Sequence, residues 1–244
     1  MSARLVPVLP GITQIRGGIV NCYLIADADG LVLIDAGMPA DMRRILQAID
    51  ASGRGLRDLR LILITHADGD HVGCAAQLQL AARAAGGAAR LCVPAGEAAS
   101  LAAGKPAREM RARGLLKVAL QLVARLFAFK PLAADATLVD GELLPVLGGL
   151  QVLTTPGHTP GHCSFFAGAQ RLLFAGDAFK NFGGRLRVSD GMNTWDERAA
   201  LQSALRLSAL APDVLCMGHG PVLRDAAPAM QRVVTAHKLR VETG

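Results

Sequence analysis

The 244-residue sequence predicts a mixed α/β protein, and three observations lead to this fold class. Hydrophobic residues make up 51% of the chain and charged residues 19%, a globular composition that excludes a largely disordered chain. Short strand-like runs alternate with longer segments of helical spacing. A series of strands, then helices, then a further strand occurs twice. The length suits one large domain or two small ones, and the repetition suggests two related halves.

Short strands punctuated by glycine open the first half. We expect them over residues 5–8, 12–16, 19–26 and 31–35. Residues 41–52 have helical spacing, and residues 59–65 form a continuous apolar run typical of a strand buried on both faces. The first half then continues with an expected helix over 72–85, a strand over 90–93, and helices over 95–103 and 108–129.

The second half repeats this order with shorter strands, separated by Asp-Gly, Gly-Gly and Pro-Gly turn signals. The expected strands span residues 137–139, 142–146, 150–154, 163–167 and 171–175. A helix over 195–210, a strand over 214–217 and a closing helix over 226–239 complete the prediction.

A cluster of His and Asp residues directly follows the first buried strand. It contains four side chains able to bind a metal, namely His66, Asp68, Asp70 and His71. Imidazole and carboxylate are the ligands expected of Zn, Fe and Mn sites. No helix or strand presents this spacing on one face, so the groups converge only where the backbone turns tightly, which Gly69 allows. A single His beside a single Asp is usually an exposed polar pair without a function, but four such groups within six residues indicate a metal site.

The chain resembles the metallo-β-lactamase superfamily in an ordered set of motifs. Residues 66–71 (HADGDH) align with the family signature H-x-H-x-D-H, and residues 155–162 (TPGHTPGH) resemble its T-P-G-H-T-x-G segment. Residues 175–177 (AGD) and 218–220 (GHG) are similar to its G-D and final G-H-G. The resemblance runs from about residue 10 to residue 222. It implies a single domain over residues 1–244, folded as a four-layer αββα sandwich with a helical insertion.

The resemblance also implies a centre of two metal ions with seven protein ligands. His66, Asp68 and His158 would bind the first ion, Asp70, His71 and His219 would bind the second, and Asp177 would bridge them. Two ions a few ångströms apart could share one hydroxide, lower its pKa and polarise a carbonyl or phosphoryl oxygen. Asp70 could accept a proton from that water and pass it to the leaving group, so it is the candidate catalytic residue.

Asp68 stands where the family pattern usually has a second His. A carboxylate oxygen lies two bonds from Cβ, as does the imidazole Nδ1 that binds in the family, so the replacement is geometrically reasonable. The added negative charge should weaken the ions as Lewis acids and favour harder metals such as Mn or Fe. Zn nevertheless remains the first expectation. The alternative is that Asp68 is a spectator and the first site is weak or empty.

The formal net charge of +6 suits an anionic partner. There is no basic repeat interleaved with aromatic residues and no nucleic-acid motif, so we expect a small anionic substrate and no nucleic acid. Lys180, Asn181 and Arg185 follow the bridging Asp177 in an expected glycine-containing loop. They could bind the substrate anion or belong to a plain solvated loop.

Other residues near the motifs are expected to have structural roles. Asp35 ends a buried strand, which favours hydrogen bonding around the site over catalysis. His162 follows His158 by four residues and is expected to be structural rather than a ligand. His237 lies on the closing helix, where we expect it to face solvent.

Five cysteines without a C-x-x-C pair argue against a disulfide framework and against a Cys-based zinc site. Cys163 and Cys216 fall in expected apolar strands and should be buried. The first residues do not have the pattern of a signal peptide, so we expect a cytoplasmic location.

We expect residues 108–130 to cover the active site. They belong to a longer helical segment that runs from about residue 95 to residue 130. Residues 115–129 are apolar on nearly every face but contain Lys117 and Arg125, and are too short and too charged to span a bilayer. Apolar surface ringed by basic residues suits an apolar acyl substrate with an anionic end, or a membrane interface that supplies one. Alternatively, and with equal weight, this segment forms a homodimer interface or part of the hydrophobic core.

These features predict a metal-dependent hydrolase that cleaves an ester, thioester, lactone or related acyl bond. The alternative is a di-iron redox protein that reduces oxygen or nitric oxide with a separate electron donor, since di-iron members of the family use a carboxylate, Glu, at the position of Asp68. A metal-binding module without catalysis is disfavoured, because every ligand position holds a competent residue.

Overall fold

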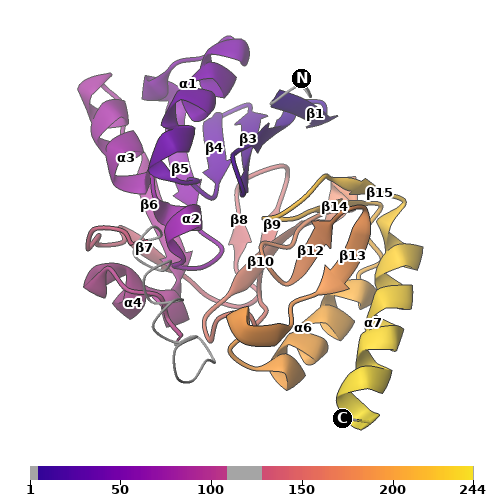
Figure 1. Cartoon of the computed structure of the whole chain (residues 1–244). Coiled ribbons are helices and arrows are strands. Elements are labelled where there is room, and N and C mark those ends of the chain that lie inside the picture. Colours follow the sequence, from indigo (N-terminus) through magenta and orange to yellow (C-terminus); the bar gives the residue numbers. More distant parts are fainter. Residues whose placement is uncertain (1–4, 109–127, 244) are drawn as a thin grey trace. The chain divides into compact units, whose positions relative to one another are not determined.

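The computed structural model describes residues 5–108 and 128–243. The chain divides into two compact units (Figure 1). Unit 1 comprises Met1–Pro106 and Phe127–Leu138, and unit 2 comprises Ala107–Leu126 and Val139–Gly244. Within the described ranges, no helix has the length and hydropathy needed to cross a membrane.

The described strands of unit 1 form one seven-stranded sheet in chain order. They are β1 (Leu5–Leu9), β2 (Ile12–Arg16), β3 (Asn21–Asp27), β4 (Gly30–Ile34), β5 (Leu59–Leu63), β6 (Arg90–Pro94) and β7 (Ala136–Leu138). The first four strands are an antiparallel meander, whereas β4 to β7 run parallel. Parallel strands bring their carboxyl ends to one edge, so the segments that follow β4, β5 and β6 meet there.

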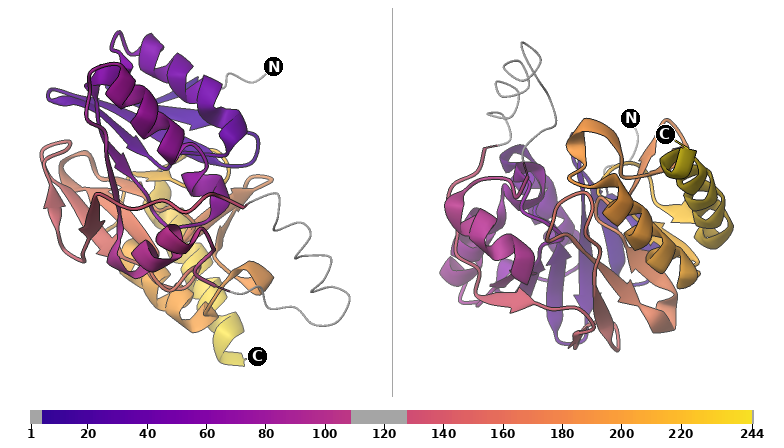
Figure 2. Two further views of the ribbon diagram at one scale, coloured as in Figure 1. Left: turned by 90° about the vertical axis from the view of Figure 1, so that its left-hand side faces the viewer. Right: turned by 90° about the horizontal axis from the view of Figure 1, so that it is seen from below.

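Helices cover one face of this sheet. The described helical elements are η1 (Pro39–Asp41), α1 (Met42–Ala51), η2 (Leu56–Asp58), α2 (Gly69–Val72), α3 (Ala75–Ala84), η3 (Ala95–Glu97) and α4 (Ala98–Ala103). The helices α1 and α3 lie on the same face (Figure 2, left). Ile45 and Ile49 of α1 and Leu78 of α3 are buried in the core of unit 1, because their spacing gives each helix one apolar side.

Unit 2 contains a six-stranded sheet and a separate hairpin. The sheet has the order β15-β14-β11-β10-β9-β8, with β8 (Leu143–Leu144), β9 (Leu150–Thr154), β10 (Cys163–Ala167), β11 (Leu172–Phe174), β14 (Val214–Cys216) and β15 (Leu223–Arg224). The hairpin pairs β12 (Phe179–Phe182) with β13 (Arg185–Val188). The remaining elements are η5 (Gly168–Gln170), η6 (Gly191–Asn193), α6 (Glu197–Ala209) and α7 (Ala226–Thr243). The helices α6 and α7 pack against each other, and α7 also contacts β13 (Figure 1).

The predicted fold class is confirmed, and most expected elements agree with the structure within a few residues. Each unit contains one large sheet and helices that pack with it. The predicted αββα sandwich requires two such pairs of a helix layer and a sheet. The strand β8 is shorter than predicted because it is followed by Pro145, which has no N–H for the ladder. The helix α6 starts at Glu197 because the Asp196 side chain accepts hydrogen bonds from the amides of Arg198 and Ala199.

Three predictions about local structure were wrong. Residues 179–188 form the β12–β13 hairpin rather than a loop, with Gly183 and Gly184 at φ +58° and +76° in its turn. The expected helix over 72–85 is split into α2 and α3 around Gly73, where a Cβ would lie 2.6 Å from the carbonyl oxygen of Gly37. Gly69 begins α2 and has no positive φ, so a short helix makes the turn.

The predicted helix over 108–129 lies largely outside the described residues. At its ends, residue 108 lies in a bend, and residues 128 and 129 have no regular structure.

Candidate metal centre

In unit 1, the four candidate ligands after β5 lie together at the carboxyl end of the strand. Asp68 has an extended backbone, and α2 then carries Asp70 and His71. The rings of His66 and His71 have centroids 4.0 Å apart. The Oδ2 atom of Asp68 is 3.4 Å from Nε2 of His66, and Oδ2 of Asp70 is 4.0 Å from Nε2 of His71. The unit 1 half of the centre therefore presents two imidazoles and two carboxylates in one group.

Asp35 orients both of these imidazoles. It follows β4, is 2% exposed and accepts a hydrogen bond from Nδ1 of His71 at 2.8 Å. It also accepts from the Thr65 amide at 2.8 Å and from the Thr65 hydroxyl at about 3.0 Å. Since the single Thr65 hydroxyl proton goes to Asp35, the Thr65 oxygen accepts from Nδ1 of His66 at 2.9 Å. Both histidines then keep a lone pair on Nε2, and Asp35 has the hydrogen-bonding role that its position predicted.

Glu97 fixes the segment between the two histidines of unit 1. Its side chain is fully buried, and Oε2 accepts a hydrogen bond from the amide of Ala67 at 2.9 Å. The sequence analysis missed this residue, because no local pattern connects η3 with a loop thirty residues earlier.

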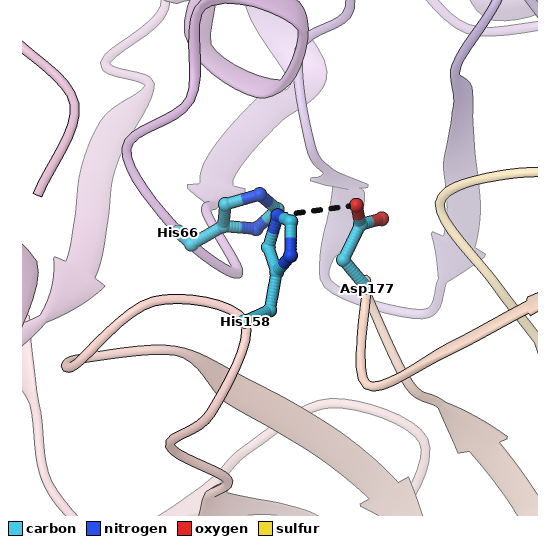
Figure 3. A group of neighbouring side chains, drawn as sticks. All are labelled: His66, His158 and Asp177. Atoms are coloured by element: carbon cyan, nitrogen blue, oxygen red, sulfur yellow. Dashed lines mark ion pairs between the residues drawn. The ribbon is translucent and has the colours of Figure 1, made fainter. Parts of the chain in front are cut away.

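In unit 2, Asp177 is the centre of a charged group. Its Oδ2 atom is 3.3 Å from Nε2 of His158, 3.2 Å from Nε2 of His219 and 3.1 Å from Nζ of Lys180. Figure 3 shows the contact between His158 and Asp177. Burial by itself would raise the pKa of Asp177, but His219, Lys180 and His158 outweigh burial and hold that pKa well below its usual value. The Asp177 side chain is therefore a carboxylate, the form that binds metals.

Close backbone packing positions the loops that carry these ligands. Gly157, before His158, has φ +142°, and a Cβ there would lie 2.4 Å from the amide nitrogen of Ala200. Gly220, after His219, has φ +96°, and a Cβ there would lie 2.0 Å from the carbonyl oxygen of Asn181. Both loops therefore require glycine for backbone conformation and for space.

His162 has the structural position that the sequence indicated. Its Nε2 accepts a hydrogen bond from the amide of Asp177 at 3.0 Å, and its Nδ1 is 2.8 Å from the hydroxyl of Thr155. These bonds connect the loop before β10 to the residue that follows β11, so His162 fixes the backbone of Asp177.

Ser189 is a further contact of the site that the sequence analysis missed. Its hydroxyl lies 3.2 Å from Nδ1 of His158 and 2.9 Å from the hydroxyl of Thr194. All three side chains are buried. The hydroxyl of Ser189 can accept from Nδ1 of His158 and donate to Thr194, an arrangement in which a metal that displaces the Nε2 proton would bind through Nε2.

The three candidate substrate residues occupy different positions. Lys180 contacts Asp177, as described above, and Arg185 is exposed on β13. Asn181 is buried, and its backbone amide donates to the carbonyl of His219 at 3.0 Å, so its backbone supports the loop that carries His219. Phe182, which the sequence analysis passed over, is 56% exposed and stacks on His219 with ring centroids 5.9 Å apart.

His237 corrects another expectation, since it is 7% exposed rather than solvated. Its Nδ1 accepts a hydrogen bond from Arg240 at 3.1 Å. Burial, and then the nearby Arg240, lower the pKa of His237 below its usual value. The buried side of α7 includes this position together with Met230 and Val234. The hydrophobic residues near His237 do not mark one side clearly, because Leu239 is 60% exposed.

The donor set in each unit fits a divalent metal ion. Two ligand atoms that bind one ion at about 2.1 Å in tetrahedral geometry lie about 3.4 Å apart. The pairs His66–Asp68, His158–Asp177 and His219–Asp177 have separations of 3.4, 3.3 and 3.2 Å. Three histidines also have Nδ1 beside a side-chain oxygen, the arrangement usual for metal-binding imidazoles.

Comparison with known proteins identifies the family. Residues 15–219 match the metallo-beta-lactamase superfamily, and the chain belongs to this superfamily. A metallo-beta-lactamase family protein from Thermus thermophilus has a similar structure, with a TM-score of 0.71, 26% identity and coverage of 97% of this chain and 82% of that one. The sequence resemblance and the fold class derived from it are thus confirmed.

Three curated relatives match most of the chain. The uncharacterized protein YobT of Bacillus subtilis is 32% identical over 90% of this chain and 91% of its own length. The probable metallo-hydrolase YflN of the same organism is 30% identical over 86% of this chain and 84% of its own. A hydroxyacylglutathione hydrolase of Ectopseudomonas mendocina is 32% identical over 70% of this chain and half of its own length. The chain therefore belongs among metallo-hydrolases.

Proposed function

We propose that the protein is a metal-dependent hydrolase of an ester, thioester, lactone or related acyl bond, with two metal ions at its centre. The proposed ligands are His66, Asp68 and His158 for the first ion and Asp70, His71 and His219 for the second, with Asp177 between them. Superfamily membership supports this assignment across the two units. The observation that carries it is the set of imidazoles whose Nδ1 atoms lie beside Thr65, Asp35 and Ser189, the orientation in which imidazoles bind a metal through Nε2.

When bound, the two ions would supply a nucleophilic water at neutral pH and polarise the acyl oxygen. The protein's own groups would position these components. Asp70 is 9% exposed and is the proposed acceptor of the proton that must pass to the leaving group. The name of the hydroxyacylglutathione hydrolase among the relatives supports an acyl substrate.

The outer face of the β12–β13 hairpin supports a substrate with an anionic end. Lys180 pairs with Arg187, and Phe182 pairs with Arg185, so alternation places these four side chains on one face. Arg185 and Arg187 are exposed, and Lys180 and Phe182 contact the ligands Asp177 and His219. An aromatic ring among three cations suits a substrate that combines an apolar group with a carboxylate or phosphate.

The proposed location is the cytoplasm. All five cysteines are buried free thiols, which is consistent with a reducing compartment. Fractionation of the native cells would test this location directly.

The function is tested by hydrolysis assays on the full chain, first stripped of metal and then loaded with Zn, Mn or Fe. The panel contains aryl esters, acyl thioesters and lactones, each with and without a carboxylate. We expect hydrolysis only with metal, loss of activity in Asp177→Asn, and preserved activity in the exposed control Asp29→Ala. The preference for carboxylate-bearing substrates should fall in Arg185→Ala/Arg187→Ala. Activity that is independent of metal, or reduction of oxygen or nitric oxide without any hydrolysis, would contradict the proposal.

A further inference from the structure

The loop over residues 189–196 holds His158 at three points. The hydroxyl of Ser189 contacts Nδ1 of the imidazole at 3.2 Å. The amide of Trp195 donates to the carbonyl of His158 at 3.1 Å, and the amide of Asp196 donates to the carbonyl of Gly157 at 3.0 Å. The same loop therefore fixes both the backbone and the ring orientation of a candidate metal ligand.

The carboxyl-terminal part of α7 fastens this loop through Arg240. Its Nη1 atom is 3.1 Å from Asp190, the residue after Ser189. Its Nη2 atom is 3.7 Å from Oε2 of Glu197 and 3.1 Å from Nδ1 of His237. The other oxygen of Glu197 accepts the amide of Gly191 at 3.0 Å. One guanidinium thus connects α7, the loop and the first residue of α6.

Simple surface ion pairing does not account for this arrangement. Arg240 is about half exposed, so a single ion pair at this position is screened by solvent and adds little stability. The guanidinium instead has three partners from three parts of unit 2, one of them the buried imidazole of His237. Its planar fork can hold all three in a fixed relation.

We propose that Arg240 is a positioning residue for His158, acting through the loop over residues 189–196. The carboxyl-terminal helix thereby sets the affinity of the metal site that contains His158. This inference rests on the proposed metal centre for its effect on affinity. The mechanical connection between Arg240 and the loop does not depend on a metal.

Two measurements on the full chain test the proposal. The first is hydrogen exchange of the Trp195 and Asp196 amides in the metal-free protein. The second is Zn affinity, obtained by competition with a chelator. The variants are Arg240→Ala, Arg240→Lys, Ser189→Ala and the double variant Ser189→Ala/Arg240→Ala, with the exposed Arg232→Ala as the control on the same helix.

We expect Arg240→Ala to exchange the two amides faster and to bind Zn several-fold more weakly, with partial recovery in Arg240→Lys and no change in Arg232→Ala. Ser189→Ala should lose about tenfold or more in Zn affinity. The double variant should lose less affinity than the sum of the two single losses, because both changes weaken the contact of the loop to Nδ1 of His158. If Arg240→Ala fails to fold, Asp190→Asn removes the same ion pair and replaces it in every measurement.

The outcomes separate this inference from the proposed function. Additive losses of affinity, unchanged amide exchange, or a Zn affinity equal to that of Arg232→Ala would each overturn the role of Arg240. Absence of Zn binding in the wild type would instead contradict the proposed metal centre, and amide exchange would still decide whether Arg240 holds the loop.

Discussion

At the scale of single residues, Asp35 and Thr65 determine which nitrogen of two histidines carries a proton. Asp35 accepts from Nδ1 of His71 directly, and it orders the Thr65 hydroxyl that accepts from His66. The same logic recurs in unit 2, where Ser189 and Thr194 order His158. These contacts hold the three rings with Nδ1 on an oxygen, the orientation in which the proposed metal ions would be bound through Nε2.

Asp68 yields the first prediction. Its Oδ2 lies 3.4 Å from Nε2 of His66, a separation that suits two ligands of one ion. Replacing this carboxylate with imidazole in Asp68→His removes one negative charge, so the variant should bind Zn more tightly relative to Mn. Competition binding with both metals measures the ratio. Asp29→His, which adds a histidine at an exposed turn, is the control. An unchanged Zn/Mn ratio in Asp68→His would show that Asp68 is not a ligand.

His237 predicts a pH dependence of stability. Burial and Arg240 lower its pKa in the folded protein, whereas the unfolded chain titrates near 6.5. As pH falls below this value, the unfolded chain binds a proton that the folded protein does not, so folding loses free energy until the folded pKa is reached. The wild type should therefore lose more unfolding free energy than His237→Gln between pH 7.5 and 5.5. Urea denaturation of metal-free protein at both pH values measures this, and equal losses would disprove it.

At the scale of elements, the β12–β13 hairpin is the part of the site that the sequence failed to predict. Its first strand reads Phe-Lys-Asn-Phe and lacks the apolar alternation of a half-buried strand, and its second strand, Arg-Leu-Arg-Val, alternates over only four residues. Phe179 and Val188 are nevertheless buried in the core of unit 2, while the opposite face lies beside Asp177 and His219. One face of the hairpin therefore carries residues that pack in the core, and the other carries polar and aromatic residues beside the candidate site. Hydrophobic patterning detects only the first kind of residue.

The hairpin and the His219 loop give a prediction about packing. Gly220→Ala would place a Cβ 2.0 Å from the carbonyl oxygen of Asn181 and also strain a backbone at φ +96°. Gly183→Ala at φ +58° has no atom within 4 Å of the added Cβ and so isolates the backbone cost, about 1–2 kcal/mol. Gly220→Ala should destabilise by on the order of 3 kcal/mol. Urea denaturation of both variants measures the difference, and equal losses would contradict the packing argument.

The candidate ligands were predictable because they occur as compact motifs after apolar strands, as with His66 to His71 and Asp177. Asp35 was predictable for the same reason. Glu97, Ser189 and Arg240 were not, since each reaches the site through a tertiary contact between distant elements. A contact between residues that are far apart in the sequence produces no local pattern of hydrophobic or polar residues, so sequence periodicity does not detect it.

At the scale of the whole molecule, each unit carries part of the proposed centre. Unit 1 holds His66, Asp68, Asp70 and His71, and unit 2 holds His158, Asp177 and His219. The predicted cover over residues 108–130 falls mostly outside the described residues, so the active-site cover and the homodimer interface stay predictions. The proposed function requires both units to contribute ligands to a shared pair of ions.

The most direct test of this requirement is the metal content of the purified full chain, measured by elemental analysis after loading with Zn, Mn or Fe. We predict two ions per chain in the wild type. His158→Ala and His219→Ala should each retain about one ion, since each variant removes a ligand of a different site. A wild-type content well below one ion per chain, with none of the three metals restoring it, would contradict the proposed metal centre.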